Sequence, residues 1–263
     1  MLHRPPPDGP FWAALCVIAG LYLLLISGML VADAAYALIH GEGLIAALTT
    51  PEVRHATLLS LISCTIASIL ALWVAVPTGY LLSRTDFPGK SLIDAIVDIP
   101  IVLPPLVIGI SLLILFASWP VRLIELYIPV TYALPGLVLA QFTVGAAFAV
   151  RAMRSSFDHL SPRTVAVAQT LGCSHAQAFF RIAVPEARRG MVTAFTVAWA
   201  RSLGEFGPVL VFVGATRMKT EVLPTTVFLE FSVGHLDTAV AVSLLLVALA
   251  LAVLVIIRRY GDR

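Results

Sequence analysis

Six apolar stretches follow one another along the chain, and short segments rich in charged residues, Gly and Pro separate them. Each stretch is close to the length of about 20 apolar residues with which a helix crosses the hydrocarbon core of a bilayer. A helix also pairs its own backbone groups where no water is available to do so. The pattern therefore predicts an all-α, polytopic membrane bundle of six transmembrane helices. The expected spans are residues 11–32, 56–82, 93–116, 134–150, 191–213 and 238–257.

The composition supports a membrane protein and excludes other classes. Of the 263 residues, 59% are hydrophobic and 12% are charged, whereas soluble domains have about 45–50% apolar and about 25% charged residues. A net charge of +2 is too small to indicate a nucleic-acid partner. The three cysteines form no CxxC pair, so we expect neither a disulfide framework nor a metal site.

The first apolar stretch allows two interpretations. It ends near Ala35-Tyr36-Ala37, which resembles a signal-peptide cleavage site. The apolar region of a signal peptide has only about 7–15 residues, and Phe11–Ala32 is longer. We therefore predict an uncleaved span.

The distribution of Lys and Arg predicts the orientation. With a cytoplasmic N-terminus, the inner segments hold Arg4, Arg84, Lys90, Arg151, Arg154, Arg163, Arg181, Arg188, Arg189, Arg258, Arg259 and Arg263. The outer segments hold only Arg54, Arg122, Arg217 and Lys219, and Arg201 falls inside a span. Cytoplasmic loops carry the excess of cations in membrane proteins. Both termini should thus be cytoplasmic, with tails at 1–10 and 258–263 around one transmembrane domain at 11–257.

The loop at residues 151–190 has helical patterns of its own. Helix formers run from Thr164 to Leu171, and Gly172 suits the left-handed residue that closes a helix. Ser174 suits the N-cap of a second helix, which we expect from His175 to about Ala183. That helix should end at Pro185, because proline disfavours a helical residue before it.

The second helix has one apolar face, formed by Ala178, Phe179 and Ile182. No obvious burial partner for this face exists within the loop. By physical reasoning alone two alternatives remain open. The helix lies on the bilayer surface or caps the bundle, or it docks into a groove of a soluble partner.

The same loop resembles the EAA cytoplasmic loop of permease subunits in binding-protein-dependent ABC importers. That motif reads Glu-Ala-Ala, three residues, Gly, nine residues, Ile-x-Leu-Pro. Ala168, Gly172, Ile182 and Pro185 match it with intact spacing, while Ala166, Val167 and Val184 depart from it. In the family the loop forms a coupling helix that inserts into the ATPase subunit. The resemblance implies ATPase contact by Ala168, Gly172, Ser174, His175, Ala178, Phe179, Arg181, Ile182 and Pro185.

Two further segments, residues 98–105 and 201–207, look like the molybdate/tungstate branch of these permeases, and the sulfate branch is close. The resemblance implies a homodimer with ATPase subunits and an external binding protein, in a bacterial or archaeal inner membrane. No cofactor is expected. Molybdate or tungstate is the leading substrate, sulfate or thiosulfate the alternative, and phosphate or ferric ion a further one.

Ionisable residues inside membrane spans cost free energy, and they usually face the bundle interior or a water-filled path. Arg201 and Glu205 are four residues apart, which places them on one helix face within pairing distance. The pair either fixes helix packing or lines a translocation path in which Glu205 helps to form a gate. Asp94 and Asp98 lie one turn apart near the inner end of the third span.

Three prolines in the third span, Pro100, Pro104 and Pro105, remove backbone donors and should bend the helix. Broken helices in transporters lie beside the path, although a kink can also serve packing alone. We therefore expect these prolines, together with Arg201 and Glu205, to line the path or its gate.

A membrane-embedded enzyme is the rival class. The sequence contains no HExxH, GxSxG or GxxxxGK[ST] motif, so we expect no catalytic residue and an ATPase on a separate subunit. A channel or secondary transporter would need no docking loop. The outer segment Thr216–Asp237 is expected to face the binding protein, either as a solvated connector or with Val222–Phe231 re-entering the bundle.

Overall fold

The computed structural model describes residues 9–39 and 41–261, without the side chains of residues 37, 42–45 and 256–261. Every regular element in these ranges is helical. The helices are α1 (Gly9–Ile39), α2 (Gly41–Leu48), α3 (Pro51–Arg84), α4 (Lys90–Val102), α5 (Pro105–Ala117), α6 (Arg122–Glu125), α7 (Leu134–His159), α8 (Pro162–Thr170), α9 (His175–Ala178), the π-helical turn η1 (Phe179–Ala183), α10 (Val184–Glu186), α11 (Arg188–Leu203), the π-helical turn η2 (Val209–Val213), α12 (Leu223–Val233) and α13 (Leu236–Gly261). Most of the two predicted tails, with Arg4 and Arg263, lies outside the described residues.

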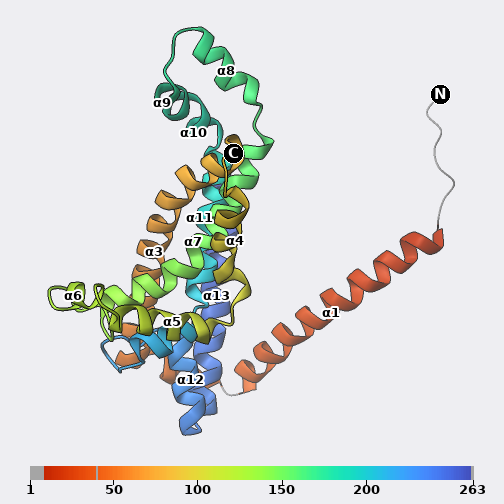
Figure 1. Cartoon of the computed structure of the whole chain (residues 1–263). Coiled ribbons are helices and arrows are strands. Elements are labelled where there is room, and N and C mark those ends of the chain that lie inside the picture. The colour runs from red at the N-terminus through yellow and green to blue at the C-terminus, as the bar shows by residue number, and fades with distance from the viewer. Residues whose placement is uncertain (1–8, 40, 262–263) are drawn as a thin grey trace.

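Three long helices, α3, α7 and α11, form the centre of the bundle, and α13 packs beside α11 and α12 (Figure 1). The α8–α10 segment (Pro162–Glu186) projects from one end of the bundle, here called the α8 end. The short helix α12 lies at the opposite end, the α12 end. Helix α1 lies apart from the bundle in Figure 1 and meets it through α2 and α13.

Small residues allow the central helices to approach closely. The buried face of α3 is a stripe at helical spacing, made largely of alanine, serine and glycine. At Gly79, a Cβ atom would lie 2.8 Å from the Cβ of Met153 on α7 and 2.9 Å from the backbone nitrogen of Arg154. Such contacts drive helix association in lipid, where no hydrophobic force operates between helices.

The predicted spans agree with the helices in most places. Within the described residues, α1, α3, α7 and α13 are long and apolar enough to cross a membrane, and the α4–α5 pair provides a fifth candidate. Residues 191–213 are divided between α11 and η2. An all-α polytopic bundle is therefore confirmed, whereas the count of six spans and their orientation stay predictions.

Several boundaries differ from the sequence-based expectation, among them the following two. Residues 93–116 do not form one helix, because α4 and α5 meet at an angle of 115°. Leu103 and Pro104 are both extended, each preceding a proline that disfavours the helical conformation. Helix α7 continues to His159, past the expected end at residue 150. The expectation took the end of the apolar run as the end of the helix, but the polar residues that follow are helical too.

The α7 C-terminus is capped by α3. The Arg84 guanidinium donates hydrogen bonds to the carbonyl oxygens of Phe157 and Leu160, with Nη2–O distances of 2.7 and 2.6 Å. The last carbonyls of a helix lack intrahelical donors, and a cation is favourable at this end. This contact holds the base of the α8–α10 segment against the bundle.

Candidate functional site

Two helix breaks face each other inside the bundle. One lies between α4 and α5 at Leu103–Pro104, and the other lies after α11, where the chain leaves the helical conformation at Gly204 and resumes it at Gly207. A cleft of about 290 Å³ opens between them, lined by Pro104, Pro105, Leu106, Arg201, Gly204, Glu205, Phe206 and Gly207. Irregular backbone at membrane depth is tolerated where it lines such a cavity.

A close approach of backbone holds the two breaks together. A Cβ atom on Gly207 would lie 2.8 Å from the Cβ of Pro105 and 2.9 Å from the nitrogen of Leu106. Only glycine fits there without moving α5. Along the same contact, a Cβ on Gly109 would lie 2.9 Å from the Cβ of Val211.

Arg201 and Glu205 form the ion pair that their spacing predicts. The Nη1 atom of Arg201 lies 2.7 Å from Oε2 of Glu205. The Glu205 side chain is fully buried, whereas that of Arg201 is 30% exposed. The Arg201 guanidinium also lies 5.9 Å from the centre of the Phe148 ring, a cation–π distance. The cation therefore keeps one open side, and the carboxylate does not.

The structure brings four of the five predicted path residues to this cleft. Pro104, Pro105, Arg201 and Glu205 line it. Pro100 stays inside α4 and does not line the cleft. The bend therefore comes from the Pro104–Pro105 pair, because two successive prolines make both preceding residues extended.

Ion pairs between α4 and α7 were not predicted. Arg151 binds Asp98, with 2.7 Å between Nε and Oδ1, and Arg154 binds Asp94. The sequence interpretation placed both arginines in the loop, since the apolar stretch ends at residue 150. Continuing the helix beyond residue 150 would have placed Arg151 and Arg154 on α7, one turn apart.

The α8–α10 segment has the two caps that the sequence predicts. Gly172 has φ +91°. The Gly172 N–H donates to the carbonyl of Gln169 and the Cys173 N–H to that of Ala168, both at 3.0 Å, which is the Schellman closure. Ser174 then forms a capping box with Gln177. Its backbone N–H donates to the Gln177 side chain at 2.9 Å.

The second helix of this segment does not end before Pro185 as expected. The chain passes through the π-helical turn η1 into α10, which includes Pro185. In η1 the Val184 N–H donates to the carbonyl of Phe179, five residues back. A π-helical turn rearranges the regular hydrogen-bond ladder, so the N–H group that proline lacks is not required there.

The predicted contact residues of the segment divide by burial. Ala168 and Ala178 are buried, Phe179 and Ile182 are half-buried, and Ser174, His175, Arg181 and Pro185 are exposed. Phe179 finds its partner outside the loop, on α3, where the Tyr80 ring centre lies 4.7 Å away. It anchors the segment to the bundle.

Three exposed apolar side chains of the segment were missed by the sequence interpretation. Leu171 is 80% exposed, Phe180 69% and Val167 56%. Phe180 contacts the Phe179 ring, with 4.9 Å between centres, and borders an apolar hollow that Trp73 and Val76 of α3 also line. The free apolar surface of the segment is thus formed by these residues rather than by Phe179.

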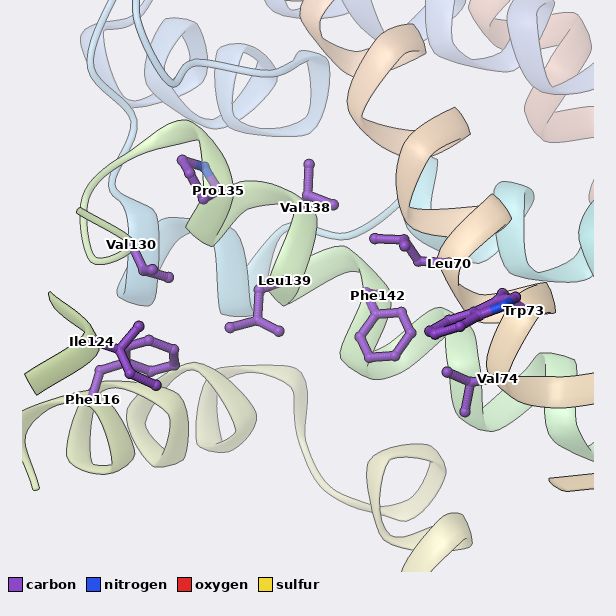
Figure 2. Close-up of a pocket in the computed structure, with 10 residues that line it drawn as sticks. All are labelled: Leu70, Trp73, Val74, Phe116, Ile124, Val130, Pro135, Val138, Leu139 and Phe142. Atoms are coloured by element: carbon purple, nitrogen blue, oxygen red, sulfur yellow. The ribbon is translucent and has the colours of Figure 1, made fainter. Parts of the chain in front are cut away.

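A larger apolar hollow on the side of the bundle is not an anion site. It encloses about 520 Å³ between α3, α5, α6 and α7, and Figure 2 shows Trp73 and Phe142 on its wall opposite Phe116. Its ten lining residues are all apolar side chains apart from the indole of Trp73. A small anion needs convergent donors, which this hollow lacks.

At the α12 end, a compact group of charged residues follows η2. Arg217 binds Glu230, and Nδ1 of His235 lies 2.9 Å from the other carboxylate oxygen of Glu230. Helix α12 is partly buried, with Leu223 and Thr226 enclosed against α3 and α13. Residues 222–231 therefore pack into the bundle rather than forming a solvated connector.

Known proteins share this sequence and this architecture. Residues 70–263 match the family model described as "Binding-protein-dependent transport system inner membrane component". The molybdate/tungstate transport system permease protein WtpB of Thermococcus kodakarensis is 35% identical over 217 residues, 82% of each chain. The sulfate transport system permease protein CysT of Escherichia coli is 31% identical over 226 residues, 82% of this chain and 80% of that one.

A solved structure has the same fold. A chain of the bacterial alginate ABC transporter, in complex with an alginate pentasaccharide-bound periplasmic protein, superposes with a TM-score of 0.76. The alignment covers 95% of this chain and 93% of that one at 13% identity. The matched residues 70–263 include both the cleft and the α8–α10 segment. The chain therefore belongs to the family of inner membrane components of binding-protein-dependent transport systems, which are transport subunits and not enzymes.

Proposed function

We propose that this chain forms the translocation path of an ABC importer for a tetrahedral oxyanion, with molybdate or tungstate as the first substrate. The carrying observation is the cleft between two facing helix breaks, which holds the Arg201–Glu205 pair inside the bundle. Similarity to molybdate/tungstate and sulfate permeases supports the anionic class. Sulfate or thiosulfate is the second candidate, supported by the similarity to CysT.

The proposed coupling element is the α8–α10 segment. It extends beyond the long helices at one end of the bundle (Figure 1) and exposes Val167, Leu171 and Phe180. Exposed apolar side chains beside a capped helix fit a groove of a soluble partner. The family partner for such a segment is the separate ATPase subunit. Its nucleotide-driven closure would move α9 and η1, and the Phe179–Tyr80 contact would transmit this movement to α3.

The proposed orientation places the α8 end in the cytoplasm. Arg84, Lys90, Arg163 and Arg188 cluster towards this end by chain order, whereas Arg54 and Arg217 belong to the other. This distribution follows the positive-inside rule. The α12 end would then face the external binding protein, and a second copy of the chain would complete the path, as the family architecture implies.

Reconstitution tests the substrate. The purified chain is assembled in liposomes with its cognate ATPase and binding protein, and uptake of labelled molybdate is measured against unlabelled molybdate, tungstate, sulfate and thiosulfate. We expect molybdate and tungstate to compete at the lowest concentrations. Competition by sulfate alone would transfer the assignment to the second candidate, and uptake that needs no ATP would contradict the importer itself.

A further inference from the structure

We propose that Arg201 is the side chain in the path that receives the transported anion, and that Glu205 is its built-in competitor. The inference rests on the proposed function and deepens it, because it assigns opposite roles to the two members of the ion pair. The two members of the pair differ in exposure. Only one of them is enclosed.

The exposure of the two side chains supports this division. The Glu205 carboxylate is fully buried, and Arg201 Nη1 at 2.7 Å is its ion-pair partner. The Arg201 side chain is 30% exposed and lines the cleft. A guanidinium has five N–H donors in one plane. Its Nη1 atom contacts Glu205, so an anion in the cleft that takes this group competes with the carboxylate.

The surroundings of Arg201 suit an oxyanion. The central carbon of the guanidinium lies 5.9 Å from the centre of the Phe148 ring, within the range of a cation–π contact. The cleft is also lined by Pro105 and Leu106, the first residues of α5. The first N–H groups of a helix lack intrahelical acceptors and carry partial positive charge. At the start of α5, however, Pro105 has no N–H group and the Val107 N–H donates to the Pro104 carbonyl. Arg201 is therefore the one positive side chain among the residues that line this cleft of about 290 Å³.

Glu205 explains why such a site would release its anion. A translocation path must bind its ion weakly enough to let it leave. When Arg201 turns to an anion, the Glu205 carboxylate is left buried without its partner, which is unfavourable. Re-formation of the pair therefore displaces the anion. In the 2.7 Å contact between Nη1 and Oε2, the guanidinium faces a negatively charged oxygen, the kind of atom that an oxyanion would offer in its place.

A neutral pair tests the role of the charges. The variant Arg201→Gln/Glu205→Gln keeps the side-chain volume at residue 205, shortens the side chain at residue 201 and leaves no unpaired buried charge. In liposomes with the ATPase and binding protein, labelled molybdate or sulfate taken up per ATP hydrolysed should fall at least about tenfold. A packing defect would instead lower ATPase co-purification, hydrolysis and uptake together. The matched control is Arg122→Gln, an exposed arginine on α6. Uptake per ATP within about twofold of wild type would overturn the inference.

Chemical protection provides a second measurement that needs no transport. In the assembled wild-type complex, modification of Arg201 by phenylglyoxal is followed by mass spectrometry in molybdate, in sulfate, and in chloride of equal ionic strength. We expect either oxyanion to slow the modification several-fold, and Glu205→Gln to give the same protection at lower anion concentration. Equal rates in all three salts would overturn the inference. Uptake without protection would leave the proposed function standing and reject the role of Arg201. Protection without ATP-dependent uptake of any of the oxyanions would support the role of Arg201 as an anion site and reject the proposed function.

Discussion

The Asp98 carboxylate of α4 is held by Arg151 of α7, with 2.7 Å between Oδ1 and Nε. Asp94 pairs with Arg154 one turn away. No residue of α4 is fully buried, and Val97 is its partly buried side chain that packs against the central core. Partly exposed ion pairs contribute about 0–1 kcal/mol each. Helix α4 is therefore held to α7 by two ion pairs and limited apolar packing.

Removing these pairs should loosen α4 without unfolding the bundle. In Asp94→Asn/Asp98→Asn, we expect faster hydrogen exchange over residues 90–102 and unchanged exchange in the buried part of α3. The reason is that the α3–α7 core contains neither residue. Asp86→Asn removes an exposed carboxylate paired with Lys90 and serves as the control. Equal exchange in α4 of both variants would contradict this attachment.

The exposed apolar side chains of the α8–α10 segment should decide ATPase binding. Leu171→Asp and Phe180→Asp place a charge on the exposed surface, so we expect loss of ATPase co-purification with normal yield of the permease. Phe179→Ala removes a half-buried ring that packs on Tyr80 and should lower the free energy of unfolding by about 2 kcal/mol. Thermal unfolding in detergent separates the two effects. Intact co-purification of both aspartate variants would reject the coupling assignment.

Gly172 should be needed for its backbone conformation. Its φ is +91°, and no atom lies within 4 Å of the position of a Cβ, so a side chain is strained but not crowded. We expect Gly172→Ala to weaken ATPase binding by about 1–2 kcal/mol, measured as a dissociation constant. Gly172→Asn should lose less, because asparagine tolerates the left-handed region. Equal losses of ATPase affinity in the two variants would show that the added side chain, and not the left-handed backbone conformation, weakens binding.

The contact between the two helix breaks gives a matched pair of glycine variants. Gly207→Ala puts a Cβ 2.8 Å from Pro105 and should push α5 away, lowering uptake by at least about fivefold. Gly204→Ala puts its Cβ no closer than 3.9 Å to any atom and should retain uptake. Labelled anion uptake in liposomes measures both. Equal uptake would mean that the breaks do not shape the path.

Burial at the α12 end should produce a pH dependence. Glu221 lies between η2 and α12 and is buried, and burial raises the pKa of its carboxyl above the ordinary 4.5. The folded state then binds its proton at a higher pH than the unfolded state, so wild-type stability falls as pH rises from 4.5 through the raised pKa.

Glu221→Gln removes this titration. The melting temperature of the variant minus that of wild type should increase over the same pH range and then level off. Glu186→Gln, which removes an exposed carboxylate, controls for the loss of one negative charge. A difference that is constant with pH would contradict the effect of burial.

Features that depend on residues close together in the sequence could be predicted from the sequence alone. The helices follow from apolar runs of bilayer length, and the caps at Gly172 and Ser174 follow from backbone chemistry within a few residues. The Arg201–Glu205 pair needs only the i, i+4 spacing of one helix. The break before Pro105 is also local, although Pro100 shows that a proline alone does not locate it.

Features that depend on distant segments required the folded chain. Phe179 and Phe180 are adjacent on a helix, and only the position of Tyr80, about a hundred residues earlier, makes the first an anchor and leaves the second exposed. The pairing of Asp98 with Arg151 likewise joins helices distant in sequence. The cleft itself exists because Gly207 meets Pro105. Local propensity specifies each helix, but the packing of separate helices specifies which side chains remain free to meet a partner or an ion.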